Sequence, residues 1–206
     1  MTSALTAVLL FGGRAAPRRL RDLPAVAVGS DSGAAAEIDA ATASARRVIV
    51  VGSQADLAAV LTRLLKTERL DVEVAHVPGR FGAGRARRGA AQRIPLIRDE
   101  TGTALVGQAR WLPADDAEGF EGEGIVDDGV LFDGTVWEVH IEPIAAVPGL
   151  RARVVAPKAE RTGWLVGRAA QLGTTGASVV RDGVPMPRPV RRSTFYRHTQ
   201  GWLRVR

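Results

Sequence analysis

The chain has 206 residues, of which 46% are hydrophobic and 24% are charged, with a net charge of +6 and no cysteine. This composition is typical of an ordinary globular protein and excludes a disordered, collagen-like or coiled-coil chain. The absence of cysteine excludes disulfides, iron–sulfur clusters, thiolate zinc sites and a cysteine nucleophile. The length allows one domain or two lobes of about 100 residues each.

No stretch approaches the roughly 18 consecutive apolar residues of a membrane-spanning helix. A secretory signal carries Lys or Arg before its apolar segment, but no Lys or Arg precedes the apolar run at 4–11. We therefore expect a cytoplasmic protein without a membrane span. The basic residues are 26 arginines and only two lysines, which indicates a high-GC coding bias of the actinobacterial kind.

The first half of the chain predicts parallel strands and helices. The β-branched run Arg47–Val51 predicts a strand buried on both faces, and apolar residues at spacings of three and four predict a helix over 54–67. A second strand over 70–77 follows, and such a unit implies parallel strands with a right-handed crossover. The region 29–45 is either a linker or a poorly capped helix, and 79–91 predicts a loop that runs into a short helix.

From about Pro95 the pattern changes to short strands separated by turn signals such as Asp128-Gly129 and Asp182-Gly183. The expected strands are 104–110, 129–132, 135–141, 150–155, 178–181, 191–196 and 201–205. We therefore predict an α+β protein of two lobes. A small α/β lobe with parallel strands over 1–94 is followed by an antiparallel, β-sandwich-like lobe over 95–206.

Charge is strongly segregated along the chain. Residues 112–142 carry ten acidic side chains and no Lys or Arg, whereas 143–206 carry 12 basic and two acidic ones. The acidic segment is interpreted as a solvated loop against a basic lobe, or as a rim that binds Mg²⁺ or a partner.

Gly52-Ser53, at the end of a predicted strand and the start of a helix, is the first candidate site. Amide groups at such a helix start favour an anion. However, Ser53 and Asp56 also fit a capping box, which satisfies those amides without a ligand. Capping alone and capping beside a bound phosphate both stay open.

Two arginine-rich segments are further candidates for phosphate contact. The first is an acid-free cluster interleaved with glycines, which could pair with phosphate or be a solvated basic loop; it comprises Arg80, Arg85, Arg87, Arg88 and Arg93. The second mixes arginines with aromatic residues near the C-terminus, and could bind single-stranded nucleic acid or belong to the core; it comprises Arg188, Arg191, Arg192, Tyr196, Arg197, His198, Trp202, Arg204 and Arg206.

Metal and nucleophile patterns are weak. His76, His140 and His198 are far apart, and no His-Glu-x-x-His spacing is present. His140 and Glu142 share one strand face but make only two ligands. No positioned nucleophile, Walker A loop or dinucleotide-binding glycine motif is found.

The segment Arg47–Val60, followed by Asp71–Pro78, resembles the diacylglycerol kinase and NAD kinase superfamily. In that family a hydrophobic strand ends in Gly-Gly-Asp-Gly-Thr, a helix follows, and a second strand ends in Pro-x-Gly-Thr-x-Asn. An α/β nucleotide-binding lobe precedes an all-β lobe, as the change near Pro95 suggests here. The segment Arg181-Asp182-Gly183-Val184 also resembles the family's terminal Val-Asp-Gly-Glu turn. The resemblance covers the layout of residues 45–206, and its motifs cover about thirty of them.

The sequence departs from the family at the catalytic motif. Gly52 stands for the first glycine, but the next four residues stand where Gly, Asp, Gly and Thr belong. The family's catalytic Asp thus falls on Gln54, which can neither take a proton nor hold Mg²⁺ as a carboxylate. Pro78-Gly79-Arg80 keeps the Pro and the Gly but lacks the Thr-x-Asn pair.

The resemblance implies a diverged lipid-kinase-like or NAD-kinase-like protein that binds a nucleotide or another phosphate ligand at the lobe junction. ATP and Mg²⁺ are the implied cofactors, and a nucleotide or a lipid is the implied ligand. If active, it is a phosphotransferase, although the lost motif favours a pseudoenzyme with no identified catalytic residue or metal ligand. The expected phosphate-binding residues are Gly52, Ser53, Asp56, Gly79 and Arg80.

The alternative function is a non-enzymatic interaction protein. In that case the Arg-rich β lobe would bind nucleic acid or an acidic partner, and the binding would weaken steeply with salt. A hydrolase that acts through unrecognised residues also stays open.

Overall fold

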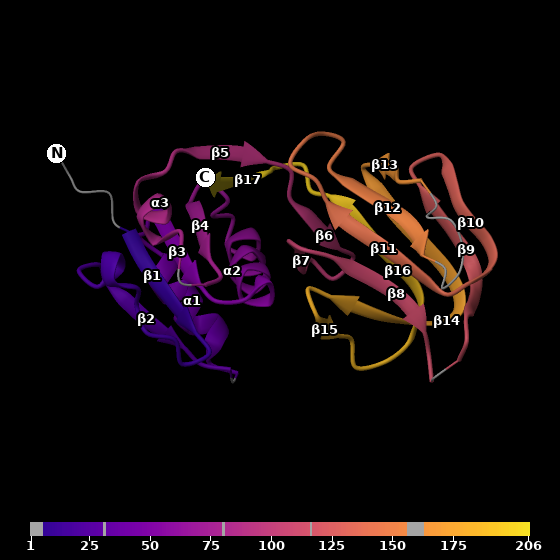
Figure 1. Ribbon diagram of the computed structural model, residues 1–206, viewed down its shortest axis with the longest axis horizontal. Helices are drawn as coiled ribbons and strands as arrows, with labels where there is room; N and C mark the ends of the chain where they lie inside the picture. The colour runs from indigo at the N-terminus through magenta and orange to yellow at the C-terminus, as the bar shows by residue number, and fades with distance from the viewer. Residues whose placement is uncertain (1–5, 31, 80, 116, 156–162) are drawn as a thin grey trace. The chain divides into compact units, whose positions relative to one another are not determined.

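The computed structural model describes residues 6–30, 32–79, 81–115, 117–155 and 163–206. The chain divides into two compact units (Figure 1). Unit 1 comprises the chain up to residue 94 together with 200–206, and unit 2 comprises 95–199. Within the described ranges, no helix is long and apolar enough to cross a membrane.

Unit 1 is built on a six-stranded sheet, sheet A, with the strand order β2-β1-β3-β4-β17-β5. All neighbouring pairs are parallel except β17 and β5. The strands are β1 (Thr6–Phe11), β2 (Ala25–Val28), β3 (Arg47–Val51), β4 (Glu73–Val77), β5 (Ala91–Ile94) and β17 (Trp202–Val205). The helices are the single-turn η1 (Arg18–Leu20), α1 (Ala34–Thr42), α2 (Gln54–Lys66) and α3 (Ala83–Arg88).

The helices cover both faces of sheet A. The chain moves in one direction across the sheet from β1 to β2 and in the other direction from β2 to β4. Right-handed crossovers therefore place η1 on one face and α1 and α2 on the opposite face. Leu20 of η1 and Ala83 and Ala86 of α3 pack in one core cluster with Val8, Ile49 and other strand residues, so α3 lies on the same face as η1. This arrangement explains why Val48, Ile49 and Val50 of β3 are fully buried.

The strand–helix–strand unit predicted from the sequence is present, with β4 shorter than expected. Two interpretations of the N-terminal segments were incomplete. Residues 6–11 of the apolar run form β1, which lies between β2 and β3, and the region 29–45 contains α1. Helix α1 begins at Ala34, and its N-cap residue Gly33 offers no side-chain cap, so its start has no sequence signal of the Ser or Asp kind.

The C-terminal strand differs from our expectation. Residues 201–205 were assigned to the β lobe, but β17 pairs with β4 and β5 of sheet A. Trp202 is buried in unit 1. The alternating pattern of a short strand indicates which of its faces is buried, but does not identify the sheet that it joins. For this reason the prediction placed residues 201–205 in the wrong lobe.

Unit 2 is an antiparallel β structure of eleven strands. Its main path runs β13-β12-β11-β8-β14-β16-β6-β7, with β9 and β15 paired to β14 and β10 paired to β9. The strands are β6 (Ile97–Asp99), β7 (Ala104–Leu105), β8 (Ala109–Pro113), β9 (Phe120–Val126), β10 (Gly129–Val136), β11 (Glu138–Pro143), β12 (Leu150–Val155), β13 (Leu165–Gly167), β14 (Ala169–Arg181), β15 (Val184–Pro185) and β16 (Val190–Arg197).

Strand β14 joins the layers of unit 2. Residues 177–181 pair with β8, whereas residues 170–174 pair with β9. Trp111, Phe120 and Phe195 lie in the single core that results, and the Trp111 indole donates to Ser193 Oγ at 3.1 Å. The predicted fold class, a small parallel α/β lobe and an antiparallel sandwich-like lobe, is confirmed.

Arg47, the first residue of β3, fixes α3 to the sheet. Its Nη1 donates to the carbonyl of Arg87 at 2.7 Å and its Nη2 to that of Gly89 at 2.9 Å. The same guanidinium pairs with Glu73 of β4 through Nε at 2.7 Å. The Arg47 side chain is only 14% exposed, so these contacts are shielded from water and satisfy the carbonyls at the end of α3.

Replacing Arg47 by Ala should therefore lower the free energy of unfolding by about 2 kcal/mol, because Glu73 and the α3 carbonyls lose their partner. Urea denaturation measures the change. Arg46→Ala is the matched control, since the Arg46 side chain is exposed and its loss should cost under about 0.5 kcal/mol. Equal effects of the two changes would contradict this role for Arg47.

Candidate functional site

The carboxyl ends of β1, β3 and β4 lie side by side at one edge of sheet A. The register pairs Leu10 with Val51 and Val51 with Val77, so the loops that begin at Gly12, Gly52 and Pro78 are neighbours. In the strand order 2-1-3-4, connections leave β1 and β3 on opposite faces of the sheet. Open α/β sheets bind ligands outside the carboxyl ends of their strands at such a switch point.

The loop after β1 is a site element that sequence reasoning missed. Gly12 and Gly13 have φ of +61° and +68°, a backbone conformation that side chains rarely tolerate. Arg14 then donates from Nη1 to the carbonyl of Pro78 at 2.8 Å, which ties the β1 loop to the β4 loop. The sequence signal that could have identified this loop is the Gly12-Gly13 pair directly after an apolar run. Gly52 likewise follows the apolar run Arg47–Val51.

Ser53 and Asp56 form a complete capping box at the start of α2. The Asp56 amide donates to Ser53 Oγ at 3.2 Å, and the Ser53 amide donates to Asp56 Oδ2 at 2.6 Å. A Cβ at Gly52 would lie 2.5 Å from Asp56 Oδ2. Gly52 is therefore needed for the close approach of the Asp56 carboxylate, and its carbonyl accepts from His76 Nε2 at 3.0 Å.

Gly79 lies at the rim of a shallow pocket of about 430 Å³ at this edge. The pocket is lined by Arg14, Ala15, Pro17, Arg18, Val51, Pro78 and Gly79. A Cβ at Gly79 would meet no atom within 4 Å, so the site has room beside it. The expected residue Arg80 lies outside the described residues. Gly52 and Gly79 are thus at the same edge, whereas Ser53 and Asp56 are engaged with each other.

The arginine cluster of the sequence separates into two groups. Arg87 forms a bidentate ion pair with Asp22, in which Nη1 and Nη2 each donate to one carboxylate oxygen at 2.7 Å. Arg93 donates to the carbonyl of Gly201 at 2.5 Å. Both are structural. Arg85 and Arg88 of α3 are exposed.

The basic C-terminal stretch is divided between the two units. Trp202 and Arg204 belong to β17 of unit 1, whereas Tyr196 of unit 2 lies under the Arg98 guanidinium at 4.6 Å. Burial and the positive charge of Arg98 lower the pKa of His198. Arg191 and Arg192 are exposed, and binding of nucleic acid or an acidic partner there stays a prediction.

His140 and Glu142 lie in a hydrogen-bonded network on β8, β11 and β12. His140 Nε2 contacts Glu138 Oε1 at 2.8 Å, and Arg151 Nη2 donates to Glu142 Oε2 at 2.7 Å. Across the described ranges, no group of three His, Asp or Glu side chains could hold a metal ion. The acidic segment is mainly the β9–β10 hairpin, not a loop.

The predicted hairpin at Asp182-Gly183 is present between β14 and β15. The Asp182 carboxylate accepts the amides of Val106, Gly107 and Gln108 at 2.6–3.1 Å. Burial raises the pKa of Asp182, although these three hydrogen bonds act in the other direction. Val184 stands where the family turn ends in Glu.

No family model and no curated protein matches the sequence. Solved structures nevertheless share its architecture. A diacylglycerol kinase from Bacillus anthracis has a TM-score of 0.74 at 12% identity, with 100% of this chain and 98% of that chain covered.

Two kinases of another substrate class are also similar. An NAD kinase from Archaeoglobus fulgidus in complex with ATP gives a TM-score of 0.66 at 11% identity, with coverage of 98% and 93%. Yeast NADH kinase complexed with NADH gives 0.65 at 8% identity, with coverage of 99% and 84%. At these identities the likeness concerns the fold.

Replacing Asp56 by Ala should lower the free energy of unfolding by about 1 kcal/mol, because the start of α2 loses its returning carboxylate. Urea denaturation measures this loss, and Asp71→Ala is the control, since Asp71 is an exposed carboxylate that pairs with Arg69 at 3.4 Å. An unchanged unfolding free energy in Asp56→Ala would mean that the carboxylate is free for another role.

Proposed function

Starting from the fold that this chain shares with NAD kinases and diacylglycerol kinases, we propose that it binds a nucleotide or another phosphate ligand at the carboxyl edge of sheet A. The observation that carries the proposal is the meeting of three glycine-bearing loops, at Gly12-Gly13, Gly52 and Gly79, beside the switch point between β1 and β3. Such loops let a phosphate approach the backbone closely.

The charge of the pocket suits an anion. Arg14 and Arg18 line it, and no acidic side chain does. A Cβ at Gly12 or Gly13 would meet no atom within 4 Å, so there is space for a ligand beside the backbone of this loop. The β1 loop, rather than the filled capping box at Ser53, is the main phosphate-contacting element in this proposal.

A nucleotide is favoured over a simple anion by the neighbours in fold, one of which is complexed with ATP and another with NADH. The residues at this edge do not fit a Mg²⁺ site of their own. The Asp56 carboxylate at the start of α2 accepts from both the amide and the hydroxyl of Ser53.

We further propose that the site binds without transferring phosphate. Gln54 occupies the position of the family's catalytic Asp, and an amide cannot act as a general base. Asp56, two residues after Gln54, is held in the capping box with Ser53. The role is then that of a nucleotide or lipid-phosphate binder.

Calorimetric titration of the full chain with ATP and ADP, each with and without Mg²⁺, tests the proposal. We expect saturable binding that Gly79→Asp weakens at least about tenfold, because a carboxylate beside the phosphates repels them. The change is tolerated by the fold, since space is open at Gly79. A labelled γ-phosphate should not be transferred to diacylglycerol or NAD.

Gly163→Asp is the matched control, because a Cβ there also meets no atom within 4 Å and the position lies in unit 2. Its affinity should equal that of the unmodified chain. No binding at millimolar nucleotide, or an equal loss in both variants, would refute the proposed site.

A further inference from the structure

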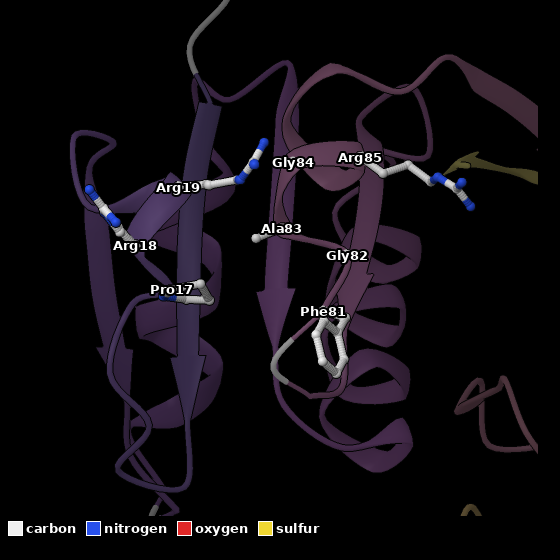
Figure 2. A pocket seen from close by; sticks show the side chains of 8 residues that line it. All are labelled: Pro17, Arg18, Arg19, Phe81, Gly82, Ala83, Gly84 and Arg85. Carbon is white, nitrogen blue, oxygen red and sulfur yellow. The ribbon is translucent and has the colours of Figure 1, made fainter.

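A second basic surface lies on the face of sheet A that η1 and α3 cover. We call it the η1–α3 surface and define it by Arg18, Arg19, Phe81, Arg85 and Arg88. Figure 2 shows its shallow hollow, which is lined by Pro17–Arg19 and Phe81–Arg85. We propose that this surface docks on an anionic lipid bilayer, a role that goes beyond ligand binding at the sheet edge.

The positive charge of this surface is not neutralised. Asp22 is the only acidic residue in 12–24 and 81–94, and both of its carboxylate oxygens accept from Arg87 at 2.7 Å. Arg87 accordingly lowers the pKa of Asp22. In the part of the chain that the structure describes, the guanidinium groups of Arg18, Arg19, Arg85 and Arg88 have no ion-pair partner.

Two of these charges are held close together. The point where a Cβ would stand on Gly84 lies 3.1 Å from Arg19 Nη1 and 3.7 Å from Arg88 Nη2. The two nitrogens therefore lie within about 7 Å of each other, and two positive charges at this range repel each other. A phosphate group at Gly84 would relieve the repulsion and accept from both guanidinium groups.

A single small anion does not account for the whole surface. Figure 2 shows that Arg18, Arg19 and Arg85 extend in different directions, so their guanidinium groups do not converge on one point. The arrangement instead fits an array of separate phosphates. Clusters of four or more Lys and Arg side chains are typical of surfaces that bind anionic lipid headgroups.

Phe81 favours a bilayer over a nucleic acid strand. Its side chain is 89% exposed, more than that of any other large hydrophobic residue described, and it lines the same hollow as Arg18, Arg19 and Arg85. An aromatic ring in this position can enter the interfacial region of a bilayer. Single-stranded nucleic acid is bound by successive aromatic side chains along a groove, and this surface has one. Arginines and an apolar side chain both contribute to attachment, because binding to a bilayer surface increases with the apolar area buried and with the electrostatic attraction to anionic lipids.

Co-sedimentation of the full chain with vesicles tests the inference. The vesicles contain phosphatidylcholine alone or a mixture with phosphatidylglycerol. We expect binding only to the mixture, and weaker binding as salt rises.

The triple variant Arg19→Gln/Arg85→Gln/Arg88→Gln should lose about a hundredfold in affinity, at about fivefold per charge. Arg18 is left unchanged because it also lines the sheet-edge pocket. Phe81→Ser should lose about tenfold, whereas Phe81→Trp should not.

The matched control is Arg188→Gln/Arg191→Gln/Arg192→Gln, three exposed arginines of unit 2, which should bind vesicles as the unmodified chain does. An equal loss in this control would overturn the proposal, because net charge alone would then explain binding. Absence of binding to the phosphatidylglycerol vesicles would also overturn it. The proposal would also be overturned if inorganic phosphate weakened vesicle binding more than chloride of equal ionic strength does. Tighter binding of a single-stranded oligonucleotide than of vesicles to this surface would overturn it as well. Nucleotide titration of the triple variant keeps this test separate from the proposed function, since Gly79 and the β1 loop are unchanged.

Discussion

The parallel pairing of β3 with β1 on one side and β4 on the other is the constraint on which the candidate site depends. It places three loops at one edge of sheet A, and the hydrogen-bonded ladders of β3 with both neighbours hold these loops in register. The path from β1 to β2 and back to β3 then sends successive connections to opposite faces. A crevice at the carboxyl ends is the geometric consequence.

Local stability and ligand binding compete for the same residues at the start of α2. The Ser53 amide donates to the Asp56 carboxylate and the Asp56 amide donates to Ser53 Oγ, so neither amide is free for a phosphate. The absence of a side chain at Gly52 lets this carboxylate approach. This explains why a glycine at the end of a strand is not by itself a phosphate loop. The open backbone at Gly12 and Gly13 moves the proposed contact to the neighbouring strand, where no side chain fills the space.

Much of the fold was predictable where one local signal decided it. The β-branched run Arg47–Val51, the capping box at Ser53 and the Asp182-Gly183 turn specify their elements without help from the rest of the chain. Strand β17 was not predictable, because its sheet is chosen by long-range pairing with β4 and β5.

For the site, the sequence indicated Gly52 and Gly79 but not the β1 loop. It also could not separate the arginines, since Arg87 and Arg88 look alike until Asp22 is seen to pair with one of them.

Hydrogen exchange of backbone amides, followed by mass spectrometry with and without ATP, tests the central claim most directly. The account predicts slower exchange in peptides that contain Gly12–Arg14 and Pro78-Gly79, with little change in unit 2 strands such as β11 and β12. Protection confined to unit 2, or no protection at saturating nucleotide, would contradict a phosphate site at the carboxyl edge of sheet A.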